Sequence, residues 1–236
     1  MSGCAVAQIM YNRAMTSLPL FPLNTVLFPG QLLPLHIFEE RYRQMIGECL
    51  QTGGPFGVVL IREGEEVGDA ATTPYPVGTT AHIVQAERLA DGRLNIICVG
   101  HARFRLQQTF HDKPYLRGEI DLWPWEPFDA ATAAHMPPLE LVRARLERYI
   151  QLLSRITQSD VNIDLPSEAA ALANLAAAVL QISVTEKQAL LSTDSIGEML
   201  DRAAALLQHE LHDLQIMYAA RVPQPPADDE SPFSQN

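Results

Sequence analysis

Two histidines near the C-terminal end of the chain flank a glutamate, a combination that can bind a metal. The segment His209-Glu210-Leu211-His212 is similar to the H-E-x-x-H helix on which zinc hydrolases bind their metal. The two histidines here are three residues apart instead of four, and no third ligand is evident in the sequence. We therefore interpret them as solvent-exposed polar residues on a helix, and the sequence predicts neither a metal nor a cofactor.

Other groups that could do chemistry are scattered. His82, His101 and His111 come from predicted strands or loops, and nothing in their spacing selects them as ligands. The segment Arg103-Phe104-Arg105 places two arginines on one strand face beside an aromatic ring, which is a sparse form of an RNA-binding surface. An ordinary solvent-exposed strand face is the alternative interpretation, and both are kept open.

The charge balance disfavours nucleic acid as a partner. The chain has a formal net charge of −11 and only two lysines, Lys113 and Lys187. Affinity for nucleic acid depends mainly on lysine and arginine neutralising phosphates. No apolar run approaches the roughly 20 residues of a membrane span. The cysteines Cys4, Cys49 and Cys98 have no disulfide pattern, so we expect reduced thiols and a cytoplasmic location.

The elements that must position these residues fall into two halves, so the predicted class is α+β. Residues 16–124 contain several strand patterns, with Asp91-Gly92 as a hairpin turn, and one helix from Phe38 to Leu50. We expect this half to close into a barrel, which hides its edges. Residues 125–136 are a predicted linker, 137–221 a helical subdomain, 1–15 a loose N-terminal leader and 222–236 a disordered acidic tail.

The stretch from Leu18 to Ile46, LPLFPLNTVLFPGQLLPLHIFEERYRQMI, contains four prolines. Because proline cannot donate a ladder hydrogen bond, we expect no unbroken central strand here. The segment should bend repeatedly while it packs its leucines and phenylalanines into a core. Some of these apolar side chains could instead form an exposed contact patch.

The same stretch resembles the opening of the N-terminal substrate-binding domain of Lon-type proteases. The ordered pattern P-L-F-P-L, V-L-F-P-G and L-P-L-x-I-F-E-x-R-Y carries the resemblance, which continues more weakly through FGVVLIREGEEVG, GTTAHI and EKQALL to Arg221. It implies a PUA-like pseudo-barrel with one covering helix, followed by an all-α bundle. Lon proteases also contain an ATPase and a Ser-Lys peptidase. The sequence has no P-loop, and neither of its lysines lies in a recognisable catalytic motif.

The resemblance therefore implies a recognition module that is not an enzyme, with an adaptor role in protein quality control as one form of it. Its partners would be unfolded or extended polypeptide and an ATP-dependent protease, and the long final helix could support a homodimer. An RNA- or small-ligand-binding PUA-like protein is the alternative. The side chains expected to bind peptide are in the proline-rich stretch and at the start of its helix: Phe21, Phe28, Phe38, Glu39, Arg41 and Tyr42.

Overall fold

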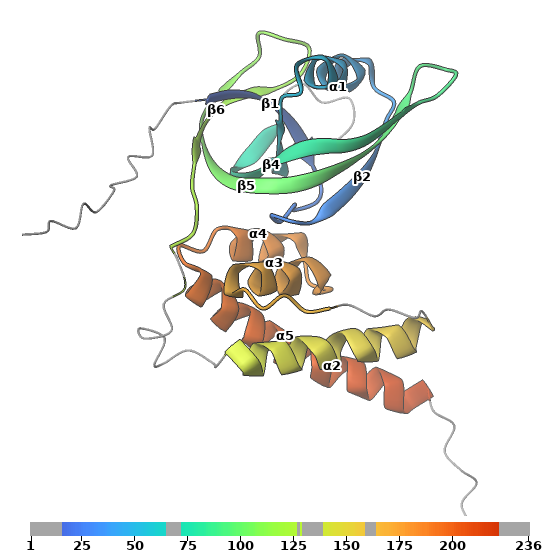
Figure 1. Ribbon diagram of the computed structural model, residues 1–236, viewed down its shortest axis with the longest axis vertical. Coiled ribbons are helices and arrows are strands. Elements are labelled where there is room, and N and C mark those ends of the chain that lie inside the picture. Colours follow the sequence, from blue (N-terminus) through green and yellow to red (C-terminus); the bar gives the residue numbers. More distant parts are fainter. Residues whose placement is uncertain (1–15, 65–71, 127, 129–138, 159–163, 222–236) are drawn as a thin grey trace, which may run out of the picture.

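The computed structural model of the 236-residue chain describes residues 16–64, 72–126, 128, 139–158 and 164–221. In this part of the chain six strands and five helices form two layers, with the β-rich half above and four helices below (Figure 1). The predicted α+β class is confirmed. The expected leader and acidic tail, and most of the expected linker, lie outside the described residues.

The β-rich half is one mixed sheet. Its strands pair in the order β2-β5-β4-β3-β1-β6, and β6 also pairs with β5, so every strand except β2 belongs to a closed ring. The strands are β1 (Thr16–Leu23), β2 (Leu32–Ile37), β3 (Phe56–Glu63), β4 (Thr73–Arg88), β5 (Leu94–Phe110) and β6 (Arg117–Leu122). Strand β2 hydrogen-bonds only to β5 among the described strands, so its other edge is free.

Strand β1 contradicts the expectation that no unbroken central strand runs through the proline-rich stretch. It runs unbroken through Pro19 and Pro22. Its first half pairs with β6, where Pro19 faces Arg117, and its second half pairs with β3, where Pro22 faces Val59. Each half of β1 therefore has a partner strand on one side only. A proline whose missing N–H would point to the side without a partner costs no hydrogen bond between strands. The prolines are tolerated because β1 changes partners between them.

Helix α1 (Glu40–Thr52) covers one face of the sheet, as the 3.6-residue apolar period predicts (Figure 1). Tyr42, Met45, Ile46 and Cys49 are buried against β1, β2 and β5. Leu50, which the period assigns to the same face, is exposed. The helix ends at Gly53, whose positive φ of 65° lets the chain turn away.

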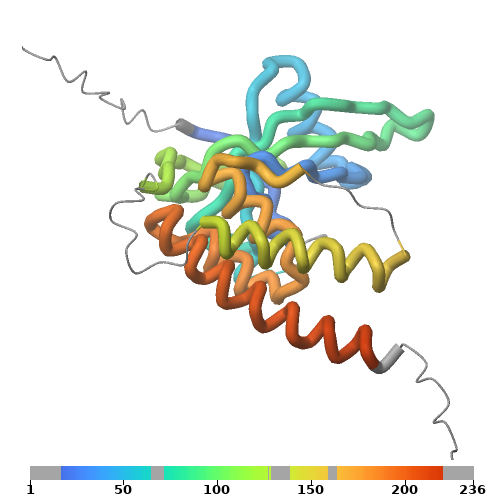
Figure 2. Tube along the Cα trace, turned by 60° about the horizontal axis from the view of Figure 1, so that its bottom comes forward, coloured from blue at the N-terminus to red at the C-terminus, as the bar shows by residue number. Residues whose placement is uncertain are grey.

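The helical layer contains α2 (Leu139–Thr157), α3 (Ala169–Val179), α4 (Val184–Leu191) and α5 (Ile196–Arg221). Helices α3 and α4 lie directly under the sheet, and α2 and α5 lie side by side on their far side (Figures 1 and 2). One core cluster contains residues of all four helices and also four residues of the β-rich half, namely Val26, Phe28, Leu60 and Val77. The two layers therefore share a core. No described helix is long and apolar enough to cross a membrane.

Helices α3 and α4 differ in how their first turns are capped. The capping box of α4 is formed by Ser183 and Glu186. Helix α3 begins after Glu168, whose side chain makes no capping hydrogen bond. The first turn of α3 thus has no side-chain cap, which leaves its N–H groups available at that end.

Candidate binding surfaces

Four of the six residues predicted to bind peptide gather where α1 meets β1. The Phe21 and Tyr42 rings stack with centroids 4.1 Å apart. The Arg41 guanidinium lies 4.5 Å from the Tyr42 centroid, and its Nε donates to Glu39 Oε2 over 3.0 Å. These contacts fix the first turn of α1 on β1, which is a structural role.

Burial separates the predicted aromatic residues into two groups. Phe21, Phe28 and Tyr42 are each less than a tenth exposed, and Phe28 belongs to the core shared with the helices. Phe38 is 50% exposed, just after β2. The buried rings face core neighbours in this conformation, while Phe38 is open to a partner. Peptide contact by the six residues stays a prediction.

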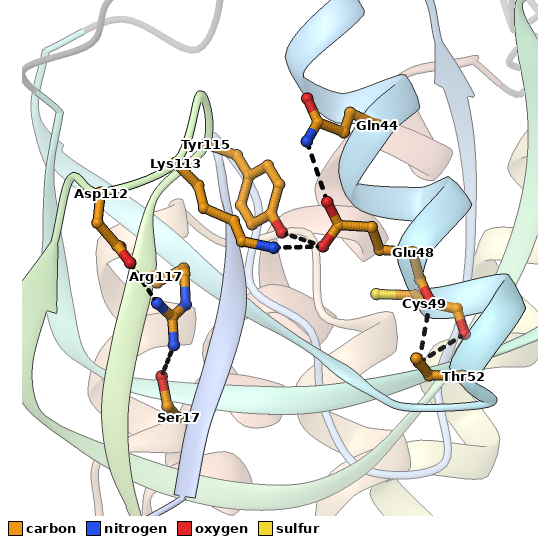
Figure 3. A network of polar contacts seen from close by, with 9 residues as sticks. All are labelled: Ser17, Gln44, Glu48, Cys49, Thr52, Asp112, Lys113, Tyr115 and Arg117. Carbon is orange, nitrogen blue, oxygen red and sulfur yellow. Dashed lines mark hydrogen bonds and ion pairs between the residues drawn. The ribbon is translucent and has the colours of Figure 1, made fainter.

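A polar network joins α1 to the turn between β5 and β6 (Figure 3). Glu48 Oε2 accepts from Lys113 Nζ over 2.6 Å and from the Tyr115 hydroxyl over 2.7 Å. The hydrogen bond from Lys113, followed by those from Tyr115 and Gln44, lowers the pKa of Glu48 to about 2. A pocket of about 230 Å³ lies beside Lys113 and Tyr115 and is also lined by Arg41 and Tyr42. Its lysine and its arginine both already have a carboxylate partner, so we interpret the network as structural.

A second surface, which sequence reasoning did not identify, is the face of the sheet opposite α1. There β2, β5 and β4 align in three cross-strand rows. We call this surface the arm face, because the hairpin of β4 and β5 extends beyond the barrel (Figure 1). From the barrel outward, the rows are Leu32–Val99–His82, Pro34–Ile97–Gln85 and His36–Asn95–Glu87.

The arm face is apolar next to the barrel and polar at its outer end. Leu32 is 61% exposed, and Val99 and Ile97 beside it are partly exposed. In the outer row His36 Nδ1 lies 2.7 Å from Asn95 Oδ1, and the His36 ring stacks against Phe38 with centroids 6.2 Å apart. Leu32, Pro34 and His36 are exposed, so α3 and α4, which lie under the same side of the sheet, leave these rows open beside the free edge of β2. We include Phe38, which stacks on His36, in the arm face; it is the one predicted residue there.

Arg103 lies at the junction between the two layers and contacts both of them. Its environment differs from the one predicted. Arg103 is 2% exposed, and its guanidinium lies 3.7 Å and 4.1 Å from the ring centroids of Trp123 and Trp125. Its Nε donates to Trp123 O over 2.7 Å, and its Nη1 donates to the carbonyl oxygens of Leu191, over 2.9 Å, and Thr193. The interpretation of Arg103 as part of a solvent-exposed strand face is therefore wrong.

Arg105 is the exposed partner of Arg103. It lies 3.4 Å from the Trp123 ring centroid and 3.6 Å from Asp194 Oδ1, with half of its side chain open to solvent. Trp123 and Trp125 are the two tryptophans of the chain. They directly follow β6, which pairs with β5 from Phe104 onward, and this position was the sequence signal for the junction.

Among the described residues, His82, His101 and His111 do not come together as a metal site. His82 and His101 have ring centroids 5.3 Å apart, whereas His111 lines the pocket beside Arg41. On α5, His209 Nδ1 lies 3.3 Å from Asp213 Oδ2, and Glu210 is close enough to complete a group of three. His209 and Asp213 are exposed, and the group contains a single histidine, which makes it a weak ligand set.

Comparison with known proteins gives a consistent result. Residues 17–209 match the family model of the ATP-dependent protease La (LON) substrate-binding domain. Lon protease 2 of Myxococcus xanthus is 28% identical over 84% of this chain, and Lon protease 1 of Thermus thermophilus is 32% identical over 87%. These alignments span 24% and 26% of the two relatives. This chain thus corresponds to about a quarter of their length.

Solved structures agree with this match. The crystal structure of a Lon N-terminal domain protein from Xanthomonas campestris superposes with a TM-score of 0.62 at 30% identity, over 81% of this chain and 98% of that one. The N-terminal domain of the Mycobacterium avium complex Lon protease superposes with a TM-score of 0.58 at 18% identity, over 82% and 98%. The second likeness concerns the fold alone.

Proposed function

Because this chain belongs to the Lon substrate-binding domain family, we propose that it is a non-catalytic module that binds extended or unfolded polypeptide at the arm face. The observation that carries the proposal is a three-stranded surface, apolar next to the barrel and exposed beside a free strand edge. An extended segment can add to such an edge through main-chain hydrogen bonds, while its alternate side chains contact the neighbouring face.

The edge strand also restricts how a polypeptide can add. Pro34 lies in the middle of β2 and has no N–H to donate. Proline on an edge strand reduces indiscriminate pairing between sheets. A bound segment would therefore gain part of its affinity from apolar contact with Leu32, Ile97 and Phe38. This supports recognition of exposed apolar side chains in unfolded chains over a purely main-chain mode.

We further propose that an energy-dependent partner performs any unfolding or cleavage. The matched family is the substrate-binding domain of an ATP-dependent protease. An adaptor that presents polypeptide to such a protease fits this family membership. Affinity capture with the intact protein, followed by identification of a Lon-type ATPase, tests the adaptor role.

Binding at the arm face is tested by titrating the protein into a reduced, unfolded casein-like polypeptide that carries a fluorescent label. Phe38→Ala and Leu32→Lys each alter an exposed apolar contact, so we expect each to weaken binding about tenfold or more. Met217→Ala is the matched control, because Met217 is a similarly exposed apolar residue on α5. Wild-type affinity in both arm-face variants, or equal weakening in the control, would refute the arm face as the site.

RNA binding is the second candidate, and the arginines argue against it. Arg103 is buried, and Arg105 lies on Trp123 beside Asp194. Arg117 donates to Asp112 over 2.5 Å and to Ser17 over 2.7 Å (Figure 3). All three are engaged within the protein. Fluorescence anisotropy with a structured RNA at low and high salt separates the candidates, because phosphate-driven binding weakens steeply with salt.

A further inference from the structure

A cavity of about 630 Å³ lies at the junction of the two layers. This volume is within the range of about 300 to 1,000 Å³ that is typical of ligand pockets. Its walls are largely apolar and come from the proline-rich stretch, from the chain leaving β6 and from α5: Pro29, Leu122, Pro124, Trp125, Phe128 and Ile196. The remaining walls come from β5, at His101 to Arg103, and from α3. The cavity does not include the arm face.

Arg103 gives this apolar cavity a buried positive charge without a direct counter-ion. No carboxylate among the described residues lies within 4.0 Å of its guanidinium, and the nearby Asp194 is paired with Arg105. Its partners are carbonyl oxygens, and its Nη2 atom has no hydrogen-bond partner. Burial lowers the pKa of Arg103 to about 9, so the side chain still carries its charge at neutral pH. An uncompensated buried cation is costly, and an anion nearby reduces that cost.

Helix α3 contributes a second feature that favours an anion. Its first residues, Ala169 and Ala170, line the cavity, and its N-cap Glu168 provides no side-chain cap. The N-terminal end of a helix carries a partial positive charge and N–H groups without helical partners. One turn further along, Asn174 is 8% exposed and lines the same cavity. Its Oδ1 atom has no partner and can only accept a hydrogen bond, so it can bind a donor on a ligand but not the carboxylate itself. Glu168 also lines the cavity, and its negative charge is the one among the lining residues that would repel an anion.

We propose that the junction cavity binds a carboxylate attached to an apolar body. The carboxylate lies toward Arg103 and the first turn of α3, and the apolar body packs against Trp125, Phe128 and Leu122. A free aromatic or aliphatic carboxylic acid and the C-terminal carboxylate of a polypeptide share this chemistry. The inference does not depend on polypeptide binding at the arm face, since the two surfaces consist of different residues.

Tryptophan fluorescence of the full chain tests this directly, because Trp125 lines the cavity and both tryptophans contact Arg103. The probes are 3-phenylpropionate and its neutral amide. We expect a saturable fluorescence change with the carboxylate and at least about tenfold weaker binding of the amide, since charge-assisted hydrogen bonds are the stronger ones. Absence of a saturable change with the carboxylate, or equal affinities of the two probes, would overturn the proposal.

Two variants and one control variant locate the site without altering Arg103, which the fold needs. Glu168→Gln removes the opposing charge and should raise carboxylate affinity about two- to fivefold, in the range of exposed charge interactions. Glu147→Gln, on the exposed face of α2, changes the net charge equally and should have no effect. Ala170→Phe should fill the cavity and abolish binding of the carboxylate. Equal effects of the two glutamine variants, or unchanged binding in Ala170→Phe, would contradict the site.

The two sources of the carboxylate are separated by an acetylated pentapeptide that ends in phenylalanine, with a free or an amidated C-terminus. Binding of the free-acid peptide, but not of the amide, assigns the cavity to polypeptide termini. Binding of 3-phenylpropionate alone assigns it to small carboxylic acids. Phe38→Ala, on the arm face, should leave both affinities unchanged, so this result is independent of the arm-face proposal.

Discussion

Replacement of Arg103 by methionine tests how the two layers are held together. Methionine keeps an apolar stem but is shorter than arginine, and it removes the charge and every hydrogen-bond donor. The change deletes three hydrogen bonds to carbonyl oxygens and two contacts with tryptophan rings. It also relieves the cost of burying a cation. The net effect depends on which contribution is larger.

The contributions can be compared from the structure. Three hydrogen bonds from a charged donor contribute about 5 to 9 kcal/mol, and the ring contacts add about 2 kcal/mol. Burial lowers the pKa of Arg103 from 12.5 to about 9, so removing the charge returns about 5 kcal/mol. We therefore expect Arg103→Met to lower the free energy of unfolding by about 2 to 6 kcal/mol. This is a large part of the roughly 5 to 15 kcal/mol that stabilises a typical domain.

Urea unfolding followed by tryptophan fluorescence and circular dichroism measures this loss. Arg105→Met is the matched control, because Arg105 lies on the same strand and contacts the same Trp123 ring. Half of the Arg105 side chain is exposed, so its ion pair with Asp194 should contribute less than about 1 kcal/mol. If the two variants lose equal stability, or if Arg103→Met is as stable as the wild type, the proposed role of Arg103 is wrong.

Three further predictions concern other parts of the fold. Gly100→Ala should lower the free energy of unfolding by about 1 to 3 kcal/mol or more, because the added Cβ would lie 2.3 Å from Phe28 O. Gly47 is a helical position with open space around it, so Gly47→Ala should be neutral or stabilising in the same urea assay. Glu48→Gln should lower the melting temperature at neutral pH. The pKa of Glu48 is depressed to about 2, so the carboxylate contributes stability above its ordinary pKa of 4.5 and loses this contribution as the pH falls toward 2. The difference in melting temperature between variant and wild type should therefore disappear over that pH range. A difference that persists below pH 2 would contradict this. Burial raises the pKa of both Cys49 and Cys98 to about 11. In a Cys4→Ser background, we therefore expect neither thiol to react with a thiol reagent near neutral pH until the protein unfolds. Fast modification of the native protein would refute their burial.

Several features of the fold could be predicted because neighbouring residues determine them. The apolar period of residues 38–50 predicted α1 and the face it buries. Asp91-Gly92 predicted the hairpin between β4 and β5, but not its turn type. The predicted two-residue turn needs positive φ at both positions, whereas here Gly92 has a positive φ of 85° and Asp91 does not, and Gly92 N donates to Leu89 O over 3.0 Å. The strand patterns did not predict that Leu94–Phe110 form one long strand, β5, with register irregularities against β4 and β6. A bulge depends on the partner strand, which local sequence does not reveal.

The sequence by itself determined the two halves, most of their helices and strands, and the family to which the chain belongs. Only the tertiary structure decided that β1 passes through two prolines by changing partners, that the arm face stays uncovered, and that Arg103 is buried. The physical reason is distance along the chain. Periodicity and turn preferences act over a few residues, whereas Arg103 is held by carbonyl groups 88 and 90 positions away, and its burial follows only when the helical layer docks on the sheet.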